Sequence, residues 1–163
     1  MSIGVATVFY SKESNKGLLL ILVAISAFIV VTSDNNPGTL VAHAINGLIA
    51  LLFFSMTIEV KDNVLSWYFG FGFLRKNVEV SDITETSFYQ SKWYQGIGIR
   101  MLSDGWLYNA SIGSALKLSL SNGKHVYIGC KDTDGLKLTL KTANEQITQN
   151  RFTRLGTFRL KLG

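Results

Sequence analysis

The sequence predicts a membrane-anchored α+β protein. A transmembrane hairpin of two helices precedes a mainly antiparallel β-barrel of about seven strands, and a C-terminal helix caps the barrel. Three observations predict this fold class: a charge-poor stretch near the N-terminus, period-two alternation through the middle of the chain, and an amphipathic segment near its end. Charged residues make up 17 % of the 163 residues, and this apolar composition excludes an intrinsically disordered chain.

The charge-poor stretch covers residues 17–58, which contain one acid, Asp34, and no Lys or Arg. The uncharged runs on either side of Asp34 would be roughly 26 Å and 36 Å long as helices. Both lengths are near the ~30 Å thickness of the hydrocarbon core of a bilayer. Residues 34–38, Asp-Asn-Asn-Pro-Gly, have the composition of a turn. We therefore expect spans at about 17–33 and 39–58, with cleavage of a signal peptide after 31–33 as the main alternative.

The basic residues predict the orientation of this hairpin. Lys12 and Lys16 precede the first span and Lys61, Arg75 and Lys76 follow the second, whereas the connecting turn has no basic residue. The positive-inside rule then predicts a protein integral to the cytoplasmic (inner or plasma) membrane, with both termini in the cytoplasm. Residues 1–16 would be an N-terminal cytoplasmic segment. The lipid bilayer would be one partner, and a homo-oligomer formed through the hairpin is compatible with this arrangement.

Residues able to perform catalysis or bind metal are few. The chain has two histidines, His43 and His125, and a single cysteine, Cys130, which provide neither a metal site nor a nucleophile with its base. We interpret His43, with Asn46 on the same helical face, as packing against the first span, and Cys130 as a packed, inert thiol. Residues 70–72 and 96–98 read Gly-x-Gly but lack the third glycine of a nucleotide-binding loop. We expect no enzyme, no cofactor and no metal.

Residues 59–148 form the second predicted domain. Alternation predicts strands near 58–60, 65–73, 78–80, 84–89, 96–101 and 106–109, and most clearly a hairpin over 115–130 that turns at Asn122-Gly123. Asp132 is a helix start, and apolar residues then recur every three or four positions from Leu136 to Ile147. A strand over 136–140 is the local alternative. Short strands followed by such a helix predict a small barrel whose open end is covered by the helix.

Two stretches of this domain carry a family resemblance. The residues Trp-Tyr-Gln-Gly-Ile-Gly-Ile-Arg at 93–100, followed by Gly-Trp-Leu-Tyr-Asn at 105–109, resemble bacterial pleckstrin-homology-like (PH-like) membrane proteins. The hairpin closing on Ile128-Gly129, with an Asp-led helix after it, is similar as well, and the similarity covers about 57–142. It implies a seven-stranded PH-like barrel on a membrane anchor and no known catalytic residues. The turn at 61–63 has one Lys beside an acid, so inositol phosphate recognition is not expected.

Aromatic and basic side chains around these stretches form the candidate ligand or partner surface: Lys92, Trp93, Tyr94, Arg100, Trp106 and Tyr108. We expect a non-catalytic module that presents a groove or a strand edge to a protein partner. Core packing is the alternative for the aromatic residues, and an ion pair with Asp104 or Glu85 is the alternative for Arg100. Basic residues are too sparse here for nucleic-acid binding.

Residues 149–163 form a basic C-terminal tail. No acid follows Glu145, whereas the tail carries Arg151, Arg154, Arg159 and Lys161 among apolar residues. Contact with an anionic membrane surface, a last strand of the barrel and a solvated tail are all compatible with this pattern. With the tail included, recognition of anionic phospholipid head groups is the alternative function.

Overall fold

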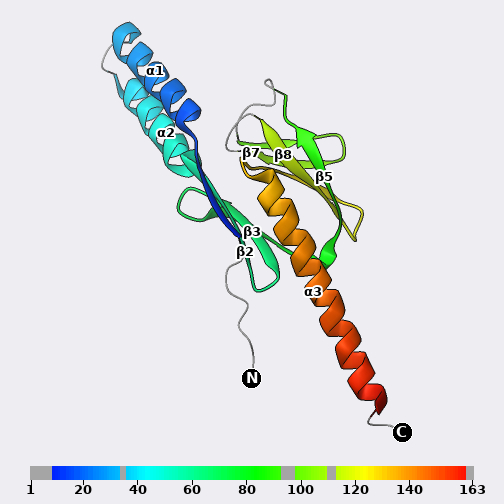
Figure 1. The fold of residues 1–163 in the computed structure, drawn as a ribbon. Helices are drawn as coiled ribbons and strands as arrows, with labels where there is room; N and C mark the ends of the chain where they lie inside the picture. The colour runs from blue at the N-terminus through cyan, green and yellow to red at the C-terminus, as the bar shows by residue number, and fades with distance from the viewer. Residues whose placement is uncertain (1–8, 34–35, 93–97, 110–112, 161–163) are drawn as a thin grey trace.

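Two β-sheets, a helical hairpin and one long helix make up the protein (Figure 1). The computed structural model describes residues 9–33, 36–92, 98–109 and 113–160, and only the backbone of 154–160. In chain order the elements are β1 (Phe9–Ser14), α1 (Lys16–Thr32), α2 (Pro37–Phe53), β2 (Ser55–Lys61), β3 (Val64–Phe69), β4 (Phe73–Glu79), the 3₁₀ turn η1 (Val80–Asp82), β5 (Ile83–Gln90), β6 (Gly98–Met101), β7 (Gly105–Asn109), β8 (Ser114–Leu120), β9 (His125–Gly129) and α3 (Thr133–Leu160).

The first sheet is antiparallel with the order β1-β2-β3-β4. The hairpin of α1 and α2 is inserted between its neighbouring strands β1 and β2. The insertion leaves and re-enters the sheet at one point, where the Asn15 N–H donates to the Phe54 carbonyl (2.8 Å). The Asn15 side chain also accepts from the Leu18 N–H (3.3 Å) and so caps α1. Strand β1 lies within residues 1–16, which were expected to be an N-terminal cytoplasmic segment.

The second sheet has the order β5-β8-β9-β7-β6. The predicted hairpin over 115–130 is confirmed, since β8 and β9 pair in antiparallel register around a turn in which Gly123 has a φ of 76°. The pairing of β7 with β9 is parallel, which no local pattern indicated. Gly105 is required there, because a Cβ on it would overlap the backbone carbonyl of His125.

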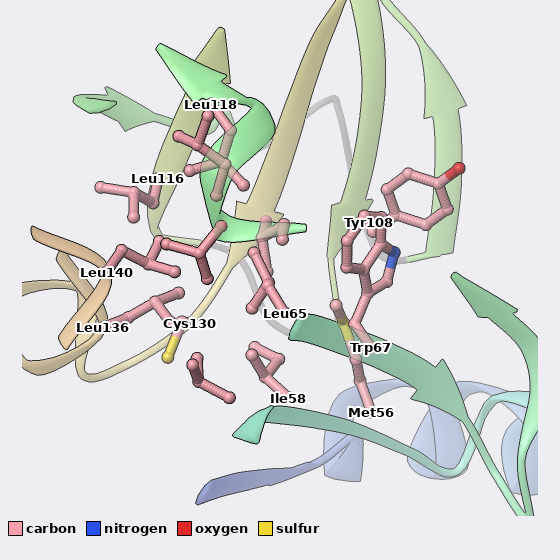
Figure 2. Packing of buried hydrophobic residues seen from close by; sticks show 14 of the residues in the cluster. Met56, Ile58, Leu65, Trp67, Tyr108, Leu116, Leu118, Cys130, Leu136 and Leu140 are labelled. Atoms are coloured by element: carbon pink, nitrogen blue, oxygen red, sulfur yellow. The ribbon is translucent and has the colours of Figure 1, made fainter. Parts of the chain in front are cut away.

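The core lies between the two sheets and is closed on one side by α3. Side chains of the first sheet (Met56, Ile58, Leu65 and Trp67) meet Leu116, Leu118 and Ile128 of the second sheet and Leu136 and Leu140 of α3. Figure 2 shows the leucines at one end of this cluster and Trp67 with Tyr108 at the other. The predicted helix is confirmed: the Asp132 carboxylate accepts from the Gly135 N–H (2.9 Å) at its start.

The prediction of a seven-stranded closed barrel is wrong. In the described part of the chain, nine strands form two sheets, of four and five strands, in which β4 and β6 are outer strands. The chain leaves the first sheet at η1, so β5 pairs with β8 and not with β4. The two sheets therefore face each other without closing along these edges.

The prediction of a transmembrane hairpin is also wrong, and with it the membrane anchor and the location with two cytoplasmic termini. Helices α1 and α2 have 17 residues each, or about 26 Å, and none of the helices in the described ranges has the length and apolar character needed to cross a bilayer. The predicted second span was too long because its last residues are not helical. Strand β2 already begins at Ser55.

Candidate functional site

A groove with a volume of about 960 Å³ lies between the two sheets. One wall is the outer strand β4, and the other is formed by β6, β7 and the start of β9. The lining residues are Trp67, Leu74, Lys76, Asn77, Val78, Glu79, Asp82, Ile99, Asp104, Gly105, Trp106, Tyr108, Leu120, Asn122, Lys124, His125 and Val126. The groove therefore runs along the outer strands β4 and β6 of the two sheets.

The connection from β3 to β4 places β4 at this edge. Gly70 and Gly72 both have positive φ angles, 55° and 107°, and a Cβ on Gly70 would lie 2.8 Å from the Leu51 carbonyl oxygen. A register shift between Trp67 and Phe69 accompanies the turn. Strand β4 then runs exposed to solvent, and Val78 is its one half-buried residue.

The backbone of β4 offers hydrogen-bonding groups to the groove. The Val80 N–H donates to the Asn63 carbonyl (2.9 Å), and hydrogen-bonded pairs alternate along an antiparallel ladder. The register therefore makes Val78 and Lys76 the residues bonded to β3. The N–H and C=O groups of Asn77 and Glu79 point to the outside of the sheet.

The floor of the groove is aromatic. Trp67 of β3 and Tyr108 of β7 pack edge to face, with ring centroids 5.3 Å apart, and both are buried, with 1 % and 7 % of their surface exposed. Burial raises the pKa of the Tyr108 hydroxyl. Trp106, two residues before Tyr108 and on the same face of β7, is 47 % exposed. Aromatic surface thus continues from the core to the rim.

Two buried nitrogen atoms of the lining lack a hydrogen-bond partner among the described residues. They are Nε1 of Trp67 and Nδ1 of His125. Buried polar atoms in folded proteins are nearly always paired. The register of β9 with β7 places His125 on the face of the sheet opposite Trp106 and Tyr108, so the Trp67 N–H is the unpaired donor on the aromatic side of the groove.

An ion pair with a hydrogen bond fixes the turn between β6 and β7 at one end of the groove. The Asp104 carboxylate accepts from the Lys117 ammonium (2.8 Å) and from the Tyr127 hydroxyl (2.8 Å and 2.9 Å to its two oxygens). These hydrogen bonds lower the pKa of Asp104. The pKa of Tyr127 is raised, first by burial and then by its bond to Asp104. These contacts join the β6–β7 turn to Lys117 of β8 and Tyr127 of β9.

The groove contains two of the six residues predicted as a partner surface, Trp106 and Tyr108. Arg100 pairs with Leu107 in the β6–β7 register, so it lies on the face of the sheet opposite Ile99 and Tyr108. Lys92 is exposed beyond the end of β5 and does not line the groove. Trp93 and Tyr94 lie outside the described residues.

The described part of the tail belongs to helix α3, none of whose described residues lines the groove. Helix α3 continues to Leu160, so the last-strand alternative for the tail is wrong. Its core contacts end at Ile147, and Figure 1 shows that the helix extends past the sheets, away from helices α1 and α2. Arg151 is exposed on this extension. Arg154 and Arg159 belong to the same helix, but their side chains, like Lys161, lie outside the described residues.

In the hairpin, Asn46 has the packing role predicted for it. Its amide nitrogen donates to the Leu22 carbonyl (2.9 Å) and to the Ser26 hydroxyl (2.6 Å), and so joins α2 to α1. His43 lies beside it, in a shallow depression of about 440 Å³ between the helices.

The described residues contain no grouping of three or more His, Cys, Asp or Glu side chains that would hold a metal ion. Cys130 is 1 % exposed, and burial raises the pKa of its thiol, which disfavours the reactive thiolate. Sequence reasoning missed Trp67, His125 and the edge of β4. The alternation around 65–73 placed Trp67 in a strand, but no signal marked that strand's neighbour as an outer one.

Comparisons with known proteins add no assignment, because neither protein-family models nor the sequences of curated proteins match the chain.

Proposed function

We propose that the protein is a non-catalytic interaction module that binds an extended segment of a protein partner in the groove, as an additional strand on β4. The observation that carries the proposal is the outer strand β4, which is exposed except at the half-buried Val78 and forms one wall of the groove. Adding a strand to a free sheet edge is a common way for proteins to bind peptides.

The edge of β4 suits this binding better than the opposite edge of the same sheet. Strand β1 is also an outer strand, but its residues do not line the groove. A segment added to β4 gains main-chain hydrogen bonds from Asn77 and Glu79 and side-chain contacts from the apolar floor at the same time. Main-chain bonds supply affinity in such complexes, and side-chain pockets supply specificity.

The resemblance to PH-like proteins supports a binding role without catalysis, because it implies no known catalytic residues. The charges on the rim support a peptide partner rather than an anion. Lys76 and Lys124 are accompanied there by Glu79 and Asp82, so the rim carries both signs.

The extension of α3 supports a second candidate function, recognition of anionic phospholipid. The sequence has no acid after Glu145, and it carries Arg151, Arg154 and Arg159 within α3 and Lys161 after it. Each basic residue near an anionic surface contributes about 1 kcal/mol. Flotation of the full chain with anionic and zwitterionic vesicles tests this idea. Equal flotation after changing these four residues to Gln would contradict it.

The peptide proposal is tested with the full chain and a display library of random peptides of about ten residues, the length of a long strand. The Asn77→Pro variant removes an outward N–H of β4 and leaves the ladder to β3 intact. Lys12→Pro is the matched control. Asn15 donates to the Phe54 carbonyl, so by the same alternation the Lys12 N–H points outward from β1.

We expect peptides selected on the unchanged protein to bind Lys12→Pro normally and to lose at least tenfold in affinity for Asn77→Pro. Thermal unfolding of both variants controls for damage to the fold. Equal binding to both variants, or a library that yields no binding peptide, would overturn the proposal.

A further inference from the structure

We propose that the floor of the groove is an anchor pocket for a tyrosine of the partner segment, whose hydroxyl oxygen accepts a hydrogen bond from the indole N–H of Trp67. This inference rests on the proposed function, since it names the side chain that a segment added to β4 places in the groove.

The first step is the unpaired donor. Trp67 is 1 % exposed, yet its Nε1 has no acceptor among the described residues. Figure 2 shows this nitrogen on the side of the ring turned away from the leucines of the core, beside the strand that carries Tyr108. Trp67 also lines the groove. A buried N–H of this kind is costly unless an acceptor reaches it, and the groove, which Trp67 lines, is the side from which we infer that one arrives.

The second step is the chemistry of the acceptor. An indole N–H donates and never accepts, so the ligand must bring an oxygen. A carboxylate is not favoured, because the rim holds Glu79 and Asp82 as well as two lysines. A neutral oxygen fits this mixed rim better.

The third step is the size and polarity of the lining. Ile99, Trp106, Tyr108 and Val126 present apolar or aromatic surface on the side of β7 and β9, and Val78 presents it on β4. Trp106 is half exposed and has a free edge for ring contacts. An aromatic ring with a hydroxyl group at its end matches both the lining and the donor. Tyrosine is the natural side chain with this chemistry.

The test uses the full chain and two matched display libraries of about ten-residue peptides, with a fixed central tyrosine in one and a fixed central phenylalanine in the other. We expect the unchanged protein to bind tyrosine peptides about tenfold more tightly than their phenylalanine counterparts, the effect of one hydrogen bond to an otherwise unpaired donor. In Trp67→Phe, which keeps an aromatic ring and removes the N–H, this preference should disappear.

A second measurement does not depend on how well Trp67→Phe folds. The indole N–H protons of the three tryptophans should give separate NMR signals in the unchanged protein, and the variants Trp93→Phe and Trp106→Phe assign them. Tyrosine peptides should shift the Trp67 signal downfield, and phenylalanine peptides should not. A Trp67 signal that responds equally to both peptides would overturn the anchor.

The outcomes separate the two proposals. If peptides bind Asn77→Pro more weakly but show no preference for tyrosine, the result supports strand addition to β4 and contradicts the tyrosine anchor. If Trp67→Phe abolishes the preference for tyrosine and Asn77→Pro binds the peptides normally, the result supports the tyrosine anchor and contradicts strand addition. Failure of both libraries to yield a binder would reject both.

Discussion

The α1–α2 hairpin and the two-sheet unit are both rich in apolar residues, but they use them in opposite ways. In the hairpin, Leu22 and Asn46 are the buried residues of the two helices, and side chains such as Leu20, Val31 and Leu40 are more than two thirds exposed. In the two-sheet unit, Ile58, Leu116 and their neighbours are fully buried. The amount of apolar sequence therefore does not decide burial; the elements packed opposite do.

The interactions that hold the two regions together differ accordingly. The hairpin has one partner helix for each helix, and a side-chain amide, that of Asn46, makes the buried hydrogen bonds between them. In the two-sheet unit, apolar side chains of both sheets and of α3 pack together in one buried cluster. We expect substitutions in the sheets to change the free energy of unfolding far more than equal substitutions in the hairpin.

The largest expected effect comes from shortening a core leucine. Leu116→Ala should lower the free energy of unfolding by about 2–5 kcal/mol, because it leaves a cavity between the sheets and α3. Leu48→Ala, at a position that is 59 % exposed in α2, should change it by less than about 0.5 kcal/mol. Urea unfolding of both variants measures the difference. Similar losses of unfolding free energy in the two variants would show that the exposed face of the hairpin is buried in solution. The hairpin and the sheets would then not differ in how they use apolar residues.

A buried carboxylate gives the next largest effect. Glu13 of β1 is 4 % exposed; it accepts from the Lys131 backbone N–H (3.2 Å) and pairs with the Lys131 ammonium (3.3 Å). Glu13→Gln should lower the free energy of unfolding by about 1–3 kcal/mol, since it removes a charged acceptor and places an amide near those donors. Glu85→Gln, at an exposed position of β5, is the control. A loss equal to that of the control would mean that β1 is not fastened to the start of α3.

The parts of the fold that were predictable depend on neighbours in the sequence. The Asn122-Gly123 turn needs only its own residues and the alternation beside it, and the start of α3 needs only Asp132 and the following turn. Both elements were found. The end of α2 was misplaced because apolar residues such as Met56 and Ile58 suit a helix and a buried strand equally well, and pairing with β3 decides between them.

The parts that were not predictable depend on distant contacts. Strand β1 exists because it pairs with β2 across the whole hairpin, and the groove exists because Trp67 of one sheet meets Tyr108 of the other. Trp106 and Tyr108 were selected as a surface from a local motif, and they do line the groove. Arg100 of the same motif was misplaced because adjacent residues of a strand face opposite sides.

A third prediction tests the polar contact of the hairpin directly. Asn46→Ala should lower the free energy of unfolding by about 1 kcal/mol, the usual contribution of a hydrogen bond between helices. Ser26→Ala removes the other side-chain partner. Combining the two should cost less than the sum of the single effects, because both remove the same bond. Strict additivity in urea unfolding would show that the Asn46–Ser26 contact contributes nothing.

The smallest expected effect is a pH dependence at the groove wall. Hydrogen bonds from Lys117 and Tyr127 hold the pKa of Asp104 below its ordinary value of 3.8. Above that value the carboxylate is charged in both the folded and unfolded states, and its contribution to stability is complete. As the pH falls from about 4 towards 2, the unfolded chain binds the proton first, so the contribution is lost.

The thermal midpoint of Asp104→Asn should therefore fall less steeply over this acidic range than that of the unchanged protein, and Glu85→Gln should follow the unchanged protein. The difference should be small because the Asp104 side chain is 39 % exposed, and exposed ion pairs contribute little. Parallel curves for Asp104→Asn and the unchanged protein would mean that Asp104 does not hold the β6–β7 turn. The wall opposite β4 would then be free to move, and the groove would adapt to its ligand rather than meet it preformed.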